Sequence, residues 1–224
     1  MTRTTNARIA GVTYLFYIAV GLTSMVLSGR ASGGAGIAEK LASIGQHTTA
    51  MGVVTLSGLL QSVAALVLAV TTYALTREED PDLAMLGLTC RVGEGLIGIG
   101  IPTSLGLVWL ATATGADAPD TAAAHALGAF LREVGGWTSL TSATFFAVGS
   151  TLFSFLFLRG RLIPISLAWL GVIASGLLVA CLPLRLAGFL DGPVTLFMWL
   201  PMLVYEVTLA IWLLIKGVAA PAPR

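Results

Sequence analysis

The segment Val194–Ile215 reads VTLFMWLPMLVYEVTLAIWLLI, and Glu206 is its one charged side chain. An α-helix rises about 1.5 Å per residue, so a stretch of this length spans the roughly 30 Å hydrocarbon core of a bilayer. A helix that is apolar on every side needs lipid or protein around it. This segment therefore predicts a membrane-spanning helix.

Five further apolar stretches of comparable length precede it, and they are Ile9 to Leu27, Ala50 to Leu75, Leu83 to Ala113, Trp137 to Leu158 and Leu162 to Leu184. Only 10% of the residues are charged, against about 25% in an ordinary globular domain. The first stretch is longer than the roughly 7–15 residues of a secretory signal core, so we interpret it as a retained helix. Residues 1–224 are predicted to form a single all-α domain, a polytopic transmembrane helical bundle with six spans.

The longest connector, Thr114 to Gly136, carries its own helical pattern. Asp120 is placed to cap a helix whose apolar side chains recur on one face at Leu127, Phe130 and Leu131. A helix with one apolar face suits the membrane surface better than the membrane interior. We therefore expect a short interfacial helix here and not a seventh span.

The distribution of basic residues predicts the orientation, because short cytoplasmic loops carry an excess of Lys and Arg. With the N-terminus inside, the inner connectors hold Arg3, Arg8, Arg77, Arg159, Arg161, Lys216 and Arg224. The outer connectors hold Arg30, Lys40, Arg132 and Arg185. The sequence thus predicts a multi-pass protein of the cell membrane with both termini in the cytoplasm.

Several function classes are excluded at this stage. Twelve Lys and Arg against eleven Asp and Glu leave a net charge of +1, which gives no footprint for nucleic acid. His47 and His125 have no Cys or second His at ligand spacing, and the GxGxxG of Gly93–Gly98 lies inside a span with no preceding strand. The acidic turn 78–82 is interpreted as a solvated loop, although it could bind a divalent cation. No metal and no cofactor are expected.

Two acidic residues inside predicted spans are the main candidates for function. Glu94 lies about 11 residues into the third span and Glu206 about 10 residues from the end of the sixth, so both are about 15 Å from the same membrane surface. Ionisable groups at this depth are costly and default to functional hypotheses. We expect both carboxyls to face one cavity and to act as catalytic acid and base. Glu206 has no cation within a helical turn and is the better candidate for a proton-exchanging group.

Arg91 precedes Glu94 by three residues and shares its helix face. Two interpretations stay open, an ion pair that only fixes helix packing and an active role in the site. The remaining candidates are predicted substrate-binding residues: Trp199, Met202, Tyr205 and Gln61. Gln61 also fits a role as a polar contact between helices, and Pro201 is expected to loosen the last span beside Glu206.

Three stretches resemble a bacterial polytopic membrane family catalogued as domain of unknown function 4386. They are ARIAGVTYL at Ala7–Leu15, the Arg-x-x-Glu pair of Arg91 and Glu94, and PMLVYE at Pro201–Glu206 continuing through LAIWLLIKG at Leu209–Gly217. The resemblance implies the membrane fold and supports the choice of the two acids and the arginine. By architecture alone, the chain is also similar to integral-membrane terpenoid cyclases, which have short-looped helices and paired intramembrane acids.

The leading functional hypothesis is an intramembrane enzyme, terpenoid cyclase-like, that starts metal-independent chemistry by protonating an apolar, isoprenoid-like substrate. This lyase or isomerase activity predicts a closed apolar chamber with both acids in its wall. A proton-coupled carrier predicts a polar passage reaching both faces, and a structural or accessory protein predicts no chamber. Expected partners are the lipid-soluble substrate and membrane lipids, with no nucleic acid, and an oligomer stays open.

Overall fold

The computed structural model describes residues 1–98, 100–115 and 118–219, and within them the chain is all-α. Its helices are α1 (Arg3–Ala31), α2 (Ile37–Gln46), α3 (Thr48–Thr76), α4 (Pro81–Ile97), α5 (Ile101–Thr112), α6 (Thr121–Arg159), α7 (Ile165–Leu186), α8 (Val194–Phe197) and α9 (Leu200–Ile215). Arg224, counted above for the orientation, lies outside the described residues.

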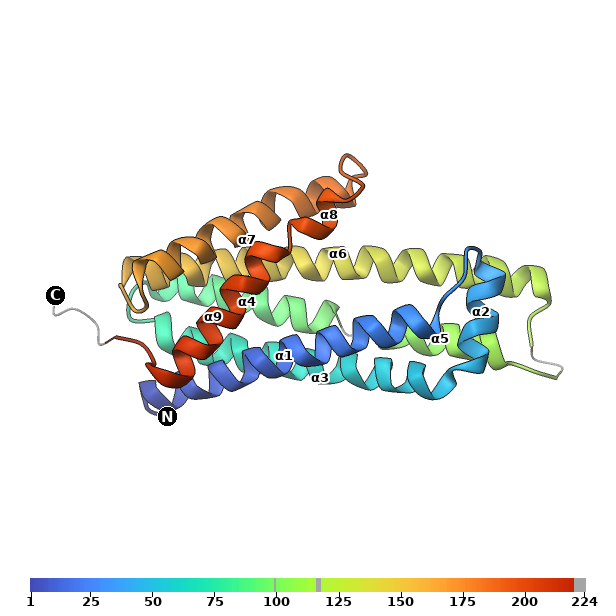
Figure 1. Cartoon of the computed structure of the whole chain (residues 1–224), viewed down its shortest axis with the longest axis horizontal. Coiled ribbons are helices and arrows are strands. Elements are labelled where there is room, and N and C mark those ends of the chain that lie inside the picture. The colour runs from blue at the N-terminus through green and yellow to red at the C-terminus, as the bar shows by residue number, and fades with distance from the viewer. Residues whose placement is uncertain (99, 116–117, 220–224) are drawn as a thin grey trace.

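The six predicted spans are confirmed as helical segments long and apolar enough to cross a membrane. They correspond to α1, α3, α4 with α5, α6, α7, and α8 with α9. In Figure 1, α1 and α3 run along the long axis of the molecule together with α6, while α7 and α9 cross that axis at an angle. The described residues thus form a membrane-like helical bundle.

Both described ends of the chain lie at the same end of the bundle (Figure 1). The Arg3 side chain donates a hydrogen bond to the Ala219 carbonyl oxygen over 3.3 Å, which fixes this proximity. An even number of passes requires this arrangement. We call this the terminal end of the bundle.

The amphipathic connector differs from the expected separate interfacial helix, because it is continuous with the fourth span in α6. Asp120 caps this helix as expected, accepting a hydrogen bond from the Ala123 N–H over 2.8 Å. The segment packs against other helices: Gly128 lies against Ile37 of α2, and Leu131 against Gly106 of α5. This packing holds the helix together through residues 135–136. The short helix outside the spans is instead α2, within the Gly/Ser-rich connector after α1.

Two spans are interrupted in the backbone. Between α4 and α5 the chain passes through Gly100, whose φ of 58° suits glycine and few other residues. Between α8 and α9 the helix breaks at Met198 and Trp199, and Pro201 occupies the first turn of α9. The disturbance expected at Pro201 is therefore present. Glu94, on the last turn of α4, precedes the first break. Glu206, in α9, follows the second.

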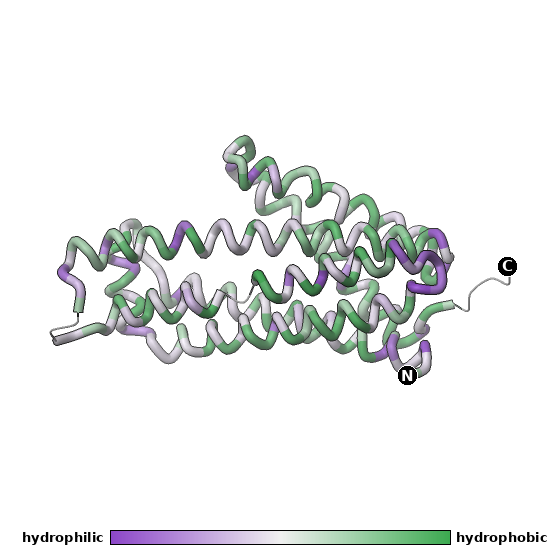
Figure 2. Tube along the Cα trace, turned by 180° about the vertical axis from the view of Figure 1, so that it is seen from behind, coloured by the Kyte–Doolittle hydropathy of each residue, from purple (hydrophilic) through white to green (hydrophobic). Residues whose placement is uncertain are grey.

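The main core is built where α1, α3, α6, α7 and α9 meet, and small residues let the helices approach closely. A Cβ added at Gly11 of α1 would lie 2.7 Å from the Leu214 Cγ and 2.8 Å from the Ala210 carbonyl oxygen of α9. Many large apolar side chains point outward, as lipid-facing residues do. Figure 2 shows hydrophobic residues along the length of the bundle, with hydrophilic residues mainly near its two ends.

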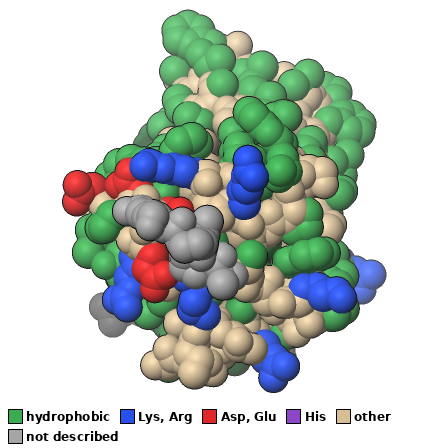
Figure 3. Space-filling model, turned by 90° about the vertical axis from the view of Figure 1, so that its left-hand side faces the viewer, with side chains coloured by type: hydrophobic (Ala, Val, Ile, Leu, Met, Phe, Trp, Pro, Cys, Tyr) green, Lys and Arg blue, Asp and Glu red, His purple; other side chains and the backbone are tan. Residues whose placement is uncertain are grey.

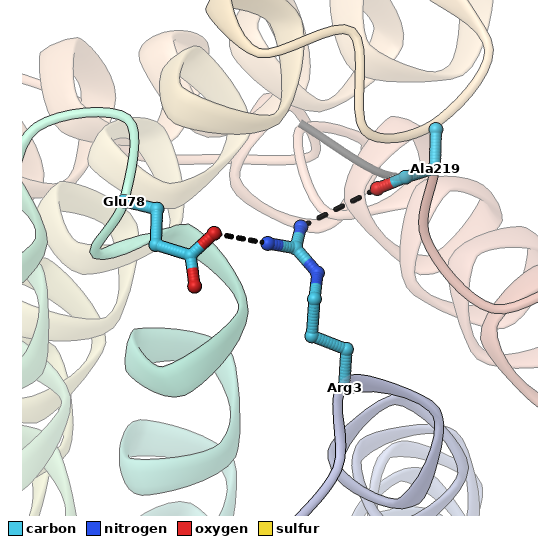
Figure 4. Close-up of polar contacts among 3 residues, drawn as sticks. All are labelled: Arg3, Glu78 and Ala219. Carbon is cyan, nitrogen blue, oxygen red and sulfur yellow. Dashed lines mark hydrogen bonds and ion pairs between the residues drawn. The ribbon is translucent and has the colours of Figure 1, made fainter. Parts of the chain in front are cut away.

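Ion pairs join the loops at the terminal end, where Figure 3 shows basic side chains at several points with acidic ones between some of them. Arg3 Nη1 donates to Glu78 Oε2 over 2.7 Å, and the same guanidinium contacts Ala219 (Figure 4). Arg159 Nη1 donates to Asp80 Oδ2 over 2.9 Å. A backbone hydrogen bond from Leu83 and the Arg159 contact lower the pKa of Asp80, the N-cap of α4.

Candidate functional site

Arg91 and Glu94 form a buried ion pair on α4, as their spacing predicts. Arg91 Nη1 lies 2.8 Å from Glu94 Oε2, and the two residues are 1% and 3% exposed. Arg91 is among the largest fully buried side chains described. Charges removed from solvent in this way are stable only when each retains a partner.

Glu94 is held from two other helices as well. The Tyr17 hydroxyl of α1 donates to Glu94 Oε1 over 2.8 Å. The Ser142 hydroxyl of α6 donates to the Glu94 backbone carbonyl over 3.0 Å. These contacts fix the last turn of α4, immediately before the break at Gly100, in both rotation and height.

The Arg91 guanidinium rests on an aromatic wall contributed by α6. Its Cζ lies 4.8 Å from the centroid of the Phe146 ring, a cation–π geometry. Trp199 is next to Phe146, with ring centroids 6.1 Å apart. A Cβ added at Gly149 would be 3.0 Å from Arg91 Cγ, so glycine leaves the space that the arginine side chain fills.

Glu206 reaches the same interior from α9. The residue is 6% exposed, and its carboxyl lies within electrostatic range of Arg91 and Glu94. Its Oε1 has no hydrogen-bond partner among the described residues. Tyr14 of α1 is buried within range of the same three charges. We refer to Arg91, Glu94, Glu206, Tyr14 and Tyr17 as the charge cluster.

The four predicted substrate-binding residues lie at different places. Trp199 contacts Phe146 beside the charge cluster, and Met202 is buried in the main core at 1% exposure. The Tyr205 hydroxyl accepts a hydrogen bond from Ser154 over 2.9 Å, so it is engaged toward α6. Gln61 of α3 lies against Gly21 of α1, which is the kind of contact between helices that the sequence suggested for it. Gly21 is one helical turn beyond Tyr17 on α1.

Sequence reasoning missed several residues of the site. Tyr14 and Tyr17 share a face of α1 with buried small residues, and this spacing is the signal that could have identified them as inward-facing. Phe146 was not among the predicted site residues. It shares a face of α6 with the buried Phe153 and Phe157, whereas Phe145 and Phe155 are exposed.

Two hollows lie elsewhere on the described part of the molecule. One of about 410 Å³ is at the terminal end, between the α6–α7 turn and the end of α9. The other, of about 300 Å³, is lined by residues of α1, α2, α3, α5 and α6, including Ser28, Thr103 and Arg132. Neither is lined by a residue of the charge cluster, so neither is the expected closed chamber with both carboxyls in its wall.

A family model described as Domain of unknown function (DUF4386) matches residues 9–217, a range that includes the whole charge cluster. No curated protein and no solved structure matches the chain. The analogy with terpenoid cyclases therefore receives no support from these comparisons.

Proposed function

The chain belongs to the family described as Domain of unknown function (DUF4386), and since that description names no reaction, we propose a function from the charge cluster itself. The protein is an intramembrane enzyme in which Glu206 gives and takes a proton. Its substrate is an apolar, isoprenoid-like molecule that enters from the lipid. Glu94 and Arg91 position the proton-bearing group and balance its charge.

The observation that carries this proposal is the charge balance of a buried site. Two carboxylates and one guanidinium sum to −1, and a net charge in an apolar interior is costly. One bound proton makes the cluster neutral. Glu94 forms an ion pair with Arg91, whereas Glu206 forms no ion pair among the described residues. Glu206 is therefore the group that we assign to carry the proton.

The chemistry follows from such an acid in apolar surroundings. The Glu206 carboxyl adds its proton to one carbon of a substrate alkene, which leaves a carbocation on the neighbouring carbon. A carboxylate then removes a proton from an adjacent carbon and restores a double bond, so the proton is regenerated. The Phe146 ring already faces the Arg91 guanidinium, and an aromatic wall of this kind stabilises a transient cation in the same way.

A proton-coupled carrier is the second candidate, and the interrupted spans favour it. The breaks at Gly100 and at Trp199 lie six residues after Glu94 and seven residues before Glu206. Many transporters bind substrate and ions at such discontinuous helices, since freed backbone groups become available there. In this alternative, Glu206 takes up the proton on one side of the membrane and releases it on the other.

Lipid extracts of cells expressing the wild type or Glu206→Gln test the enzyme proposal. We expect the wild type to convert an isoprenoid species into an isomer of the same mass, and the variant to leave it unconverted. Purified protein in detergent micelles then separates the two candidates. An enzyme converts the substrate without a sealed compartment, whereas a carrier acts only in sealed vesicles. Identical isoprenoid profiles in both extracts would remove the enzyme proposal.

The proposal places both termini in the cytoplasm, which rests on seven basic residues in the inner connectors against four in the outer ones. A Thr4→Cys variant lacking Cys90 and Cys181 tests this placement, because Thr4 is exposed at the terminal end. We expect an impermeant thiol reagent to label it only after the cells are opened. Labelling in intact cells would reverse the orientation.

A further inference from the structure

The hollow at the terminal end has basic side chains on two sides and an apolar wall. Arg161 comes from the α6–α7 turn, Lys216 follows the end of α9, and Trp212 and Val218 contribute apolar surface between them. Among the residues that the structure describes, no acidic side chain lines it. Its volume of about 410 Å³ is within the range of small-molecule sites, which begins at about 300 Å³.

Arg161 is held in a backbone conformation that normally belongs to glycine. Its φ is 49°, the one positive φ among the described residues other than glycine. The turn is a Schellman motif: the Leu162 N–H donates to the Phe157 carbonyl over 3.0 Å and the Arg161 N–H to the Leu158 carbonyl over 3.2 Å. Glycine is favoured at this position, so an arginine here is not explained by helix termination.

The glycine of this turn is Gly160, one residue before Arg161, and it is needed there for close packing. A Cβ added at Gly160 would clash with the Glu79 side chain from the α3–α4 turn. Arg161 is thus the residue in the turn that has an exposed side chain and a strained backbone together. The guanidinium side chain is therefore the feature that distinguishes arginine from the glycine favoured at this position.

The two cations at the hollow differ from two of their neighbours at the same end. Arg3 is paired with Glu78, and Arg159 with Asp80. Within the described part of the chain, Arg161 and Lys216 form no ion pair, and both are exposed. Two uncompensated cations beside a hollow without acidic lining make a site for an anion.

The walls of the hollow are fixed and adjoin the lipid-facing surface. Gly217 and Ala219 are tied by hydrogen bonds from the Gly217 N–H to the Trp212 carbonyl over 3.2 Å and from the Ala219 N–H to the Leu162 carbonyl over 2.9 Å. Ile165 and Ile215, next to the hollow in sequence, are 52% and 71% exposed. A tryptophan beside exposed isoleucines is typical of the level where a bilayer meets water.

We propose that this hollow binds the headgroup of an anionic phospholipid. The phosphate lies between Arg161 and Lys216, and the acyl chains follow the exposed apolar surface of α7 and α9. Basic pockets between transmembrane helices bind lipid headgroups on this physical basis. The proposal is independent of the chemistry assigned to the charge cluster.

The test uses purified full-length protein in a nonionic detergent and follows its thermal unfolding midpoint. The probes are dihexanoyl phosphatidylglycerol, dihexanoyl phosphatidylcholine, and inorganic phosphate at matched ionic strength. We expect phosphatidylglycerol alone to raise the midpoint of the wild type. Equal shifts from phosphatidylcholine would overturn the proposal, and a shift from inorganic phosphate as large as that from phosphatidylglycerol would assign the site to a free anion and overturn the lipid assignment.

The variants are Arg161→Gly and Lys216→Gln, with Arg8→Gln as the control for charge, because Arg8 is exposed near the same end but does not line the hollow. Each hollow variant should weaken the apparent affinity for phosphatidylglycerol about fivefold, and the double variant about thirtyfold, while the control keeps the wild-type response. Arg161→Gly should also raise the midpoint without lipid, since it relieves the positive φ. A lower midpoint without lipid together with an unchanged lipid response would make Arg161 structural and overturn the proposal.

Discussion

Replacing Arg91 with leucine should destabilise the protein strongly, and replacing its partner as well should recover much of the loss. Arg91→Leu leaves the Glu94 carboxylate with Tyr17 as its hydrogen-bond donor and no opposite charge in contact. Breaking a buried pair from one side costs about 3–5 kcal/mol.

The double variant Arg91→Leu with Glu94→Leu removes both charges. Its main residual cost is the Tyr17 hydroxyl, which then lacks its acceptor, at about 1–3 kcal/mol. We therefore expect the double variant to be more stable than the single one by roughly 2 kcal/mol, the difference between these two ranges. Adding Tyr17→Phe should recover about 1 kcal/mol more.

Reversible unfolding of these variants in mixed micelles measures each free energy of unfolding. We expect the order wild type, triple, double and single variant, from most to least stable. A single variant as stable as the wild type, or a double variant less stable than the single one, would refute the description of Arg91 and Glu94 as a mutually dependent buried pair. Activity of the stable double variant, measured in parallel, separates a chemical role of Glu94 from a packing role.

Three further predictions follow from individual contacts. Gly149→Ala should lower the free energy of unfolding by about 1–3 kcal/mol, because its Cβ would meet the buried Arg91 side chain. Gly176→Ala is the control, since its Cβ would meet no atom within 4 Å, and chemical denaturation compares the two variants. Glu206→Asp should reduce turnover on the order of 100-fold, since shortening the side chain displaces the carboxyl by about 1 Å, and a variant with full activity would remove Glu206 from the mechanism. Hydrogen bonds from Leu83 and Arg159 lower the pKa of Asp80. The stability that ionised Asp80 contributes is therefore present above its unfolded-state pKa of about 3.9, and it is lost as the pH falls through the lower folded-state pKa. Asp80→Asn should therefore abolish that part of the acid-induced loss of stability, as measured by thermal unfolding against pH.

The spans and the ion pair were predictable because each depends on local sequence. An apolar run of sufficient length has few alternatives to a membrane-spanning helix. Arg91 and Glu94 had to share a face because three residues separate them along a helix. Asp120 also predicted the start of α6 through its capping side chain.

The rest depends on how the helices rotate against one another, which the sequence alone leaves open. The contact from Tyr17 to Glu94 joins residues 77 positions apart, and no periodicity identifies that pairing. The continuity of α6 arises from its packing on α2 and α5, and the composition of the connector did not reveal this packing. Phe146 became part of the site because α6 turns its face toward Arg91.

Infrared spectroscopy of the purified protein tests the central claim, that the charge cluster holds one exchangeable proton on Glu206. A protonated carboxyl has a carbonyl stretch distinct from that of a carboxylate, and the band shifts in heavy water. We predict one such band from the membrane interior in the wild type. It should be lost in Glu206→Gln and retained in the double variant Arg91→Leu with Glu94→Leu, in which Glu206 is neutral only when it holds the proton. A spectrum in which the band is absent from the wild type, or in which Glu206→Gln leaves it unchanged, would contradict the claim.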